Sequence, residues 1–389
     1  MTGSRVARSP VALVHDYLTQ YGGGERVILM LSKAFPNAGL YTSLYDPEHS
    51  FPEFATLDIQ TMAINRIGAF RRNHRLALPL LPRSFSGLRI DADVTLCSSS
   101  GFAHGTATTG RKVVYCYSPP RWLYHTEDYL GSGRYKAALG KRGNLYGRVN
   151  AHGLKALIPS LRRWDQRAAR SADRYLTTSN AMAREIERTY GIAAEVVHPP
   201  GALAPLGPHR EVTGVDPGFL LCVSRMMPYK NLDVVVKAME YNRGDELVVV
   251  GDGPQFSEFK NPGSKRIHFL GRVEDDQLRW LYENSRALVS AAFEDYGLTP
   301  LEAAAFGKPV IVLRGGGFID TVVEGTTGHF FDKPHPRQVA DAIREADEHN
   351  WDSEKIVAHA ATFSEEGFIS RIREIVIEET NLRLEQVSS

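Results

Sequence analysis

The chain has 389 residues, of which 43% are hydrophobic and 23% are charged. This length exceeds the roughly 250 to 300 residues at which a single hydrophobic core stops growing, so two domains are expected. The composition excludes a disordered, collagenous or coiled-coil protein. The net charge of +1 conceals an asymmetry, because residues 1–199 hold 26 Lys+Arg and 15 Asp+Glu, whereas residues 200–389 hold 20 and 30. Halves of opposite charge suggest different partners for each.

No stretch approaches the roughly 20 uninterrupted apolar residues of a membrane span, and residues 1–5 lead straight into a strand-like run, which predicts a cytoplasmic protein. The three cysteines, Cys97, Cys116 and Cys222, lie in or beside apolar runs without the spacing of metal ligands. They are expected to be buried thiols.

Short apolar runs bounded by turn residues alternate with longer stretches of helical period, which is typical of an α/β protein with parallel sheets. The first half begins with such a run, followed by a glycine loop at 22–24 and a helix from Glu25. The expected strands are 11–14, 94–97, 112–116, 175–178, 219–223, 246–250, 267–270, 287–290 and 309–313.

Residues 198–217 contain five prolines and little apolar periodicity, which predicts a linker. Residues 365–385 have apolar positions three and four apart, which predicts a helix. The expected domains are therefore 1–198 and 199–364, with the helix of 365–389 packing back on the first domain.

The most informative segment is 293–302, where a strand is followed by a glycine-containing loop and by a helix expected to start near Pro300. Thr299 could cap this helix. Backbone N–H groups at a helix start favour an anion, so a phosphate is expected at 297–299. Glu294 and Glu302 bracket that position. The alternative is a capped helix with a favourable acidic first turn.

Two further segments follow strands of the second half. Arg225 and Lys230 leave the end of the strand 219–223, and two cations there suit a pyrophosphate; the alternative is surface salt bridging. The turn 251–254 lets a ligand approach the backbone at Gly251. It is not the Gly-x-Gly-x-x-Gly fingerprint, which argues against a nicotinamide enzyme.

The order and spacing of these segments resemble the retaining GT-B glycosyltransferases of family 4. That family has the motifs Ser-Arg…Lys-Asn, Gly-Asp-Gly-Pro, Phe-Leu-Gly-Arg-Val and Glu-x7-Glu, which stand here at 224–231, 251–254, 269–273 and 294–302. In the first half, 15–17, 22–26 and 115–122 look like the bacterial mannosyltransferases that build O-antigen and exopolysaccharide chains.

The resemblance implies a GT-B fold, in which two Rossmann-like doubly wound domains face each other across a cleft. The resemblance also implies a role for each site residue. Among the donor-binding residues, Glu294 is catalytic and holds hydroxyls of the transferred sugar, and Arg225 and Lys230 meet the donor diphosphate. Gly297, Leu298 and Thr299 offer backbone to phosphate, Glu302 holds the ribose, Arg272 and Val273 meet the base, and Gly251 also binds the donor. The acceptor is bound by Gly23, Gly24, Tyr117 and Arg121.

The sequence departs from the family pattern at two places. Relatives often have a histidine where Tyr117 stands, and His104 is the nearest candidate to compensate as a catalytic residue. A phosphate contact or an ordinary surface histidine remain the other interpretations of His104. In addition, Asp320 stands where the family usually has Glu, and its shorter side chain weakens any sugar contact there.

Asp91 and Asp93 could form the metal-binding Asp-x-Asp of the other transferase fold. They directly precede a strand in the half without donor motifs, so a helix-to-strand turn is preferred. No metal and no cofactor is therefore expected. Arg225, Lys230 and the helix start would then stabilise the leaving diphosphate.

The resemblance therefore implies a retaining hexosyltransferase, and its first-half motifs favour one that moves mannose from GDP-mannose to a lipid-linked saccharide or polysaccharide precursor. A transferase using a UDP-sugar (glucose, galactose or GlcNAc) and a nucleotide-sugar-binding module without catalysis remain open. The basic stretch 121–170 carries apolar residues and predicts peripheral docking on anionic lipid at the inner face of the cell membrane. No nucleic-acid partner is expected.

Overall fold

A computed structural model describes residues 9–124, 145–201, 203–253, 255–259 and 264–388. Their contacts separate into two compact units, which are described here one by one. Unit 1 holds the described residues up to 199 together with 365–388, and unit 2 holds those from 200 to 364. The C-terminal helix thus belongs to the same unit as the N-terminal half of the chain.

Unit 1 is built on a seven-stranded parallel sheet of order β3-β2-β1-β5-β7-β8-β9. The strands are β1 (Ser9–His15), β2 (Leu40–Thr42), β3 (Ile59–Thr61), β5 (Ala92–Ser99), β7 (Arg111–Cys116), β8 (Arg174–Thr177) and β9 (Glu195–Val196), and β4 (Arg89–Ile90) pairs with β6 (Ala107–Thr108) in a separate sheet. Both faces of the large sheet are buried, because Leu13 packs into one apolar cluster and its neighbour Val14 into another.

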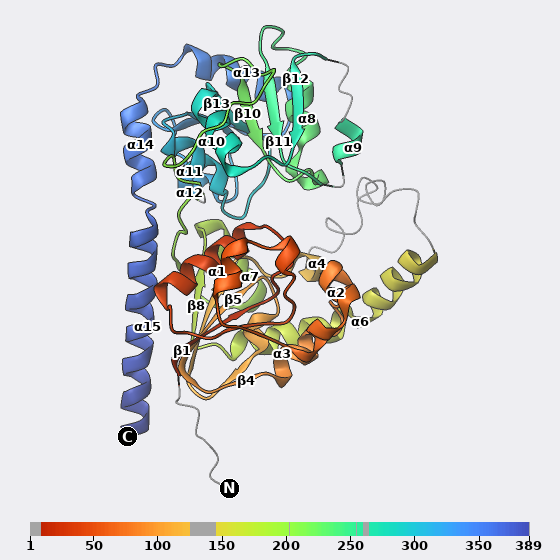
Figure 1. Ribbon diagram of the computed structural model, residues 1–389, viewed down its shortest axis with the longest axis vertical. Coiled ribbons are helices and arrows are strands. Elements are labelled where there is room, and N and C mark those ends of the chain that lie inside the picture. The colour runs from red at the N-terminus through yellow and green to blue at the C-terminus, as the bar shows by residue number, and fades with distance from the viewer. Residues whose placement is uncertain (1–8, 125–144, 202, 254, 260–263, 389) are drawn as a thin grey trace. The chain divides into compact units, whose positions relative to one another are not determined.

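The helices of unit 1 cover these two faces. They are α1 (Gly23–Ala34), α2 (Gly68–Arg72), α3 (Leu81–Gly87), α4 (Arg121–Tyr124), α6 (Leu145–Arg170), α7 (Asn180–Tyr190) and α15 (Glu365–Ser388), with short 3-10 turns η1 (Pro47–His49), η2 (Pro52–Thr56), η3 (Ala63–Arg66), η4 (His74–Leu76) and η5 (Ala103–Gly105). The C-terminal helix α15 contacts α1, β5 and β7, and Figure 1 shows it running beside this sheet. Its buried residues, Phe368, Ile372, Ile375 and Val376, join the first of the two clusters.

Unit 2 contains a six-stranded parallel sheet of order β12-β11-β10-β13-β14-β15 (Figure 1). Its strands are β10 (Leu220–Val223), β11 (Leu247–Val250), β12 (Ile267–Gly271), β13 (Ala287–Ser290), β14 (Val310–Leu313) and β15 (Gly328–Phe331). Its helices are η7 (Pro228–Lys230), α8 (Leu232–Ala238), α9 (Phe256–Phe259), α10 (Asp275–Asn284), α11 (Leu298–Ala305), α12 (Phe318–Thr321), α13 (Pro336–Glu348) and α14 (Ser353–Ala361). The strand order reverses between β10 and β13, and ligands of such sheets bind beyond the strand ends at this point.

Every strand expected from the sequence is present, with bounds shifted by one or two residues at most of the ends. The sequence analysis did not foresee β2, β3, β4, β6, β9 or β15, which have two to four residues each. The three cysteines are free and buried, as expected. Within the described ranges, no helix combines the length and the apolar character that a membrane crossing requires.

Two local expectations were wrong. Helix α11 begins at Leu298, with Gly297 as its N-cap, so Thr299 lies within the first turn and does not cap the helix. Asp91 lies between two strands, β4 and β5, and Asp93 lies inside β5, so these residues do not form a helix-to-strand turn. Both carboxylates have structural partners: Asp91 accepts a hydrogen bond from Thr109 (2.7 Å), and Asp93 pairs with Arg383 (3.1 Å).

Candidate functional site

The residues predicted to bind the donor follow the carboxyl ends of neighbouring strands in unit 2. Arg225 follows β10, Gly251 follows β11 and Glu294 follows β13. Arg272 and Val273 come directly after β12; the side chain of Arg272 is exposed and that of Val273 is half-buried. Because the strands are parallel, these loops share one edge of the sheet, on both sides of the point where the strand order reverses.

Backbone hydrogen bonds join the loops after β10 and β11. The amide of Met226 donates to the carbonyl of Asp252 (3.0 Å), and the amide of Gly251 donates to Gly271 (2.8 Å). Gly251 has a φ of 129°, and a Cβ added there would lie 2.1 Å from the carbonyl oxygen of Ser224. Only glycine fits this approach, so the glycine of the turn keeps the loop that carries Arg225 in place.

Lys230 and Glu294 form an ion pair between Nζ and Oε1, and their side chains are 11% and 25% exposed. The following residue, Asn231, has a φ of 52° and donates from its side chain to the carbonyl of Ala291 (3.0 Å), which ties the turn of Lys230 to the end of β13. Arg225 is exposed and has no ion-pair partner among the described residues. At this edge Lys230 is thus paired with a carboxylate, whereas Arg225 forms no ion pair with a described residue.

The N-terminus of α11 faces no capping side chain, because its N-cap is Gly297 with a φ of 88°. The first-turn residues Leu298 and Thr299 are both half-buried. Amides at such a helix start carry partial positive charge and suit an anion. Lys230, Arg225 and this helix start therefore all offer positive charge to a diphosphate.

Glu302 lies in the interior of unit 2, with 6% of its surface exposed. One of its carboxylate oxygens accepts a hydrogen bond from the Tyr282 hydroxyl at 2.7 Å. Burial raises the pKa of Tyr282, and the neighbouring carboxylate raises it further, so the phenol stays protonated and donates. Glu302 thus already accepts a hydrogen bond from a protein side chain. A ribose hydroxyl would have to donate to a lone pair of the Glu302 carboxylate that Tyr282 does not use.

A glycine turn after β14 supports the backbone of Glu294. The amide of Gly317 donates to the Glu294 carbonyl (2.9 Å), and a Cβ added at Gly316, whose φ is 61°, would lie 2.0 Å from that carbonyl oxygen. The sequence analysis considered only Asp320 in this region and did not predict that the glycines before it support Glu294. The three consecutive glycines at 315–317, directly after an apolar strand, were the feature of the sequence from which this support could have been predicted.

In unit 1, three side chains at the carboxyl edge form a hydrogen-bonded chain. His15 at the end of β1 contacts Ser98 of β5 (Nδ1 to Oγ, 2.8 Å), and Ser98 contacts the Tyr117 hydroxyl (2.7 Å) after β7. Tyr117 donates to the carbonyl of Gly24 (3.0 Å) near the start of α1. The sequence analysis did not foresee this chain, although the three residues stand where adjacent strands end.

The Gly24 carbonyl, at one end of this series of hydrogen bonds, fixes the direction of each of them. A carbonyl only accepts, so the single proton of Tyr117 goes to Gly24 and the proton between Ser98 and Tyr117 comes from Ser98. His15 must then donate through Nδ1–H. Burial lowers the pKa of His15 to about 4, so the imidazole is neutral at pH 7. Burial also raises the pKa of Tyr117, which keeps its hydroxyl proton in place.

Gly23 and Gly24, predicted to meet the acceptor, are the first two residues of α1. A Cβ added at Gly24 would lie 3.3 Å from the ring of Tyr117, so the ring packs tightly under this turn. Arg121, also predicted to meet the acceptor, is the first residue of α4 and is half-buried. The predicted basic stretch 121–170 falls partly on residues 125–144, which lie outside the described residues.

Asp16 organises the loop that follows β5. Its carboxylate accepts from the amides of Ser100 (2.6 Å), Phe102 (3.1 Å) and Ala103 (2.6 Å) and from the Ser99 hydroxyl (3.1 Å). It is 4% exposed, and burial raises its pKa against the opposing effect of these hydrogen bonds. Asp16 therefore anchors the neighbourhood of Ser98.

His104 is buried in the interior of unit 1, with a side chain 1% exposed. Its Nδ1 lies 3.0 Å from the Tyr175 hydroxyl, and its Nε2 lies 3.0 Å from Oδ1 of Asp165, at ion-pair distance but without hydrogen-bond alignment. The ring also packs beside Trp164. The ring is thus enclosed by protein side chains, which argues against the catalytic role expected for it, and we assign His104 to the packing of α6.

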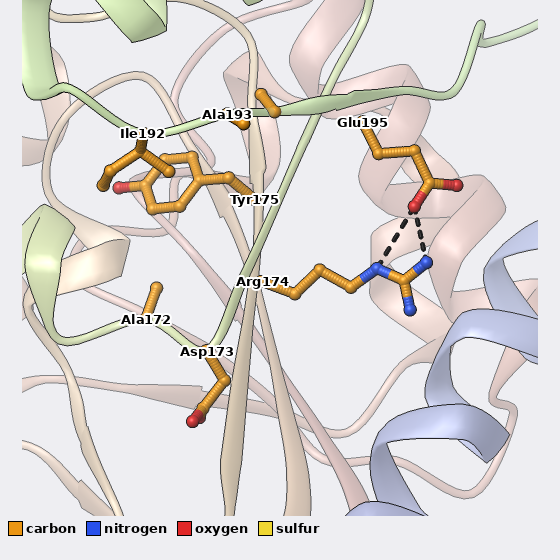
Figure 2. A pocket seen from close by; sticks show the side chains of 8 residues that line it. Ala172, Asp173, Arg174, Tyr175, Ile192, Ala193 and Glu195 are labelled. Atoms are coloured by element: carbon orange, nitrogen blue, oxygen red, sulfur yellow. Dashed lines mark hydrogen bonds and ion pairs between the residues drawn. The ribbon is translucent and has the colours of Figure 1, made fainter.

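A depression of about 420 Å³ lies elsewhere on unit 1, at the amino ends of β8 and β9. Figure 2 shows Arg174 and Glu195 in this depression, where Nε of Arg174 donates to the Glu195 carboxylate at 3.2 Å. Arg111 pairs with Asp173 on the same wall. Its charges are paired within the protein, and none of the predicted site residues lines it.

Removing one hydroxyl from the chain of His15, Ser98 and Tyr117 should destabilise unit 1. Tyr117→Phe leaves the proton of the Ser98 hydroxyl without its acceptor and the Gly24 carbonyl without its donor, so we expect the free energy of unfolding to fall by about 1–3 kcal/mol. Ser98→Ala should have a similar effect. Urea denaturation of both single variants and the double variant tests whether they share one network. Losses that simply add would contradict it.

The neutral state of His15 predicts a pH dependence of stability. Its pKa is 6.5 in the unfolded chain and about 4 in the folded protein, so as the pH falls from 6.5 towards 4 only the unfolded chain takes up this proton. Stability from His15 is present above pH 6.5 and is lost below it, by about 1.4 kcal/mol per pH unit. Urea denaturation across this range should show a shallower loss in His15→Asn, and equal slopes would contradict the assignment.

Comparison with known proteins agrees with this geometry. Residues 21–200 match the family model described as Glycosyltransferase Family 4, and residues 209–362 match the one described as Glycosyl transferases group 1. The solved structure of Anabaena HepE in complex with UDP and glucose has the same fold, with a TM-score of 0.60 at 16% identity, covering 98% of this chain and 100% of that one.

Two curated relatives illustrate the sequence similarity. The D-rhamnosyltransferase WbpZ of Pseudomonas aeruginosa is 30% identical over 208 residues, 50% of this chain and 53% of that protein. The alpha-1,3/1,6-mannosyltransferase ALG2 of Dictyostelium discoideum is 25% identical over 386 residues, 82% of this chain and 85% of that protein. The chain thus spans about half the length of the first relative and most of the second.

The two family models together span residues 21–362 apart from 201–208, and this gap falls where the chain passes from unit 1 to unit 2. Each half of the chain therefore matches a family of glycosyltransferases, family 4 in the first half and group 1 in the second, and the fold is the GT-B fold.

Proposed function

We propose that this glycosyltransferase is a retaining, metal-independent hexosyltransferase that moves mannose from GDP-mannose to a lipid-linked saccharide or polysaccharide precursor. The observation that carries the donor assignment is the convergence of Arg225, the pair of Lys230 and Glu294, and the uncapped start of α11 at one edge of unit 2. Mannose is favoured by the match to a mannosyltransferase along 82% of the chain.

In this proposal Lys230 leaves Glu294 when the donor binds and forms an ion pair with the diphosphate. The ammonium turns to the phosphate oxygens, and the Glu294 carboxylate becomes available to hydroxyls of the sugar. Arg225 and the amides at 297–299 meet the remaining charge, so the negative charge that develops on the leaving diphosphate is stabilised without a divalent ion. Lys230 thereby exchanges one anionic partner for another, and the Glu294 carboxylate accepts hydrogen bonds from the sugar hydroxyls in place of its ion pair.

Transfer with retention and without an enzymic nucleophile requires the acceptor hydroxyl to attack from the face that the diphosphate leaves. The bond from the sugar C1 to the phosphate oxygen breaks, the bond from C1 to the acceptor oxygen forms, and the leaving phosphate receives the acceptor proton. In unit 1, the turn of Gly23 and Gly24 would approach the acceptor closely. The Gly24 carbonyl accepts a hydrogen bond from the Tyr117 hydroxyl, so Tyr117 acts as a positioning residue for this turn.

A thermal-shift panel of GDP, UDP, ADP and their sugar conjugates tests the donor. A ligand at 100 times its dissociation constant stabilises the folded state by about 2.7 kcal/mol, which is enough to rank the bases. We expect GDP and GDP-mannose to give the largest shifts. A larger shift with UDP-sugars would replace the mannose donor with a UDP-sugar, and no shift with any nucleotide would contradict the donor site itself.

A further inference from the structure

One half-exposed aromatic side chain lies at the edge of unit 2 that carries the predicted donor residues. Strand β13 is followed by two buried alanines, Ala291 and Ala292, and then by Phe293, which is 51% exposed. Glu294 comes next in the chain. The chain therefore leaves the core at Phe293, and a ring and a carboxylate occupy consecutive positions beyond the carboxyl end of β13.

Among the described aromatic residues of unit 2, only Tyr241 has a similar exposure, at 49%. Tyr241 lies between α8 and β11, where the chain returns to the amino edge of the sheet, and the guanidinium of Arg337 lies over its ring, 5.5 Å from the centroid. Single exposed apolar side chains are common on protein surfaces. Exposure alone therefore assigns no role to Phe293, and the way in which its ring is supported has to be considered.

The ring of Phe293 rests on the glycine turn after β14. A Cβ added at Gly315 would lie 3.1 Å from both Cδ2 and Cε2 of this ring, and these are the only atoms that it would meet within 4 Å beyond its chain neighbours. Gly316 has a φ of 61°, which favours glycine, whereas Gly315 is not among the glycines of positive φ. The space that the Phe293 ring occupies therefore accounts for a glycine at 315.

The same turn also holds the next residue of the chain. The amide of Gly317 donates to the Glu294 carbonyl at 2.9 Å, so Phe293 and Glu294 are both supported by residues 315–317. One side of the Phe293 ring is covered by the backbone of this turn, while 51% of the residue stays open. A ring supported in this way loses little further freedom when a ligand covers its open side.

The order of the strands indicates which part of a donor reaches this ring. Strand β12 is followed by the predicted base contacts, Arg272 and Val273, and it is separated from β13 by β11 and β10. Three spacings between neighbouring strands amount to about 14 Å. Arg225, predicted to meet the diphosphate, follows β10 between them. A donor with its base at β12 and its diphosphate at β10 therefore brings its sugar to the end of β13.

We propose that Phe293 binds the transferred sugar, with its ring against the C–H face of the pyranose whose hydroxyls Glu294 holds. A pyranose has hydroxyl groups around its rim and C–H groups on its faces, so it is bound best where a polar group and an apolar surface lie close together. Phe293 and Glu294 supply both from one supported segment. This inference rests on the proposed function, which assigns Glu294 to the sugar, and adds the apolar contact.

Titration calorimetry with GDP and with GDP-mannose tests this contact, because the ratio of the two dissociation constants isolates the effect of the sugar. Phe293→Ala should raise the ratio of GDP-mannose to GDP about three- to tenfold, the range expected for one aromatic contact, and should leave the dissociation constant of GDP within about twofold of wild type. Phe293→Trp should keep the wild-type ratio, because a planar ring remains. Gly315→Ala, which crowds the ring, should also raise the ratio.

Tyr241→Ala is the matched control, because it removes an aromatic side chain of similar exposure from the same unit. It should change neither dissociation constant by more than about twofold. An unchanged ratio in Phe293→Ala or Gly315→Ala would overturn the proposal, as would an equal change in the control. Equal weakening of GDP and GDP-mannose in Phe293→Ala would place the ring on the base instead. A lower transfer rate with an unchanged ratio would place it on the acceptor.

The binding of GDP by itself separates this inference from the proposed function. If wild type binds neither GDP nor GDP-mannose and no other nucleotide, the donor site and the sugar contact are both contradicted. If wild type binds both ligands and the ratio is the same in Phe293→Ala, the sugar contact alone is contradicted. Where the thermal-shift panel selects uridine, UDP and UDP-glucose replace the guanosine pair, because the ratio tests the ring whichever base is bound.

Discussion

Glu294→Ala is expected to lower the rate of sugar transfer at least a thousandfold and to leave nucleotide diphosphate affinity within about threefold of wild type. The carboxylate is proposed to hold hydroxyls of the transferred sugar in the transition state, and interactions of this kind affect turnover more than nucleotide binding. Any change in nucleotide affinity should be towards tighter binding, because Lys230 loses the partner that it has in the donor-free protein.

Radiolabelled or coupled transfer assays give the rate, and titration calorimetry with the nucleotide diphosphate gives the affinity. Glu324→Ala is a suitable control, because this exposed carboxylate of unit 2 pairs with Arg314, away from the Lys230 pair. Turnover near the wild-type level in Glu294→Ala would contradict the catalytic assignment. A loss of nucleotide affinity without loss of turnover at saturation would place Glu294 on the nucleotide instead.

Arg225→Ala/Lys230→Ala is expected to weaken donor binding by about a hundredfold to ten-thousandfold. Each charge-assisted contact to phosphate contributes roughly 1.5–3 kcal/mol, and the two are proposed to act on the same diphosphate. Arg225→Ala alone should show the cost of one contact without disturbing Glu294. Lys230→Ala should cost more than one contact, since it also leaves the Glu294 carboxylate next to the incoming phosphates without its cation.

Calorimetry with the nucleotide diphosphate and its mannose conjugate measures these losses. Treatment with EDTA should leave both binding and transfer unchanged, because the two cations and the start of α11 are proposed to meet the phosphate charge. Lys237→Ala is a matched control, as this exposed lysine pairs with Asp233 on α8. Unchanged donor affinity in the double variant, or transfer that stops with EDTA, would contradict the metal-independent assignment.

Local signals in the sequence were sufficient for the sheet strands and for several loops of unit 2. Buried parallel strands are continuous apolar runs, so the strand 287–290 was predicted with the bounds it has. The short strands β2 and β3 were missed because three residues give too little periodicity to recognise. The start of α11 was misplaced because Pro300 and Thr299 are frequent first-turn and cap residues, while the left-handed Gly297 ends the loop earlier.

The sequence by itself determined the class of fold, the order of the loops that carry Arg225, Lys230 and Glu294, and the family resemblance, because each of these depends on residues close together in the chain. Only the tertiary structure decided which side chains meet. It paired Lys230 with Glu294, 64 residues apart, and enclosed His104 beside Asp165. It also joined His15, Ser98 and Tyr117 in one chain of hydrogen bonds. These contacts depend on which strands are neighbours and on their register. A single sequence does not reveal either, because the same apolar runs would be buried in any order of parallel strands.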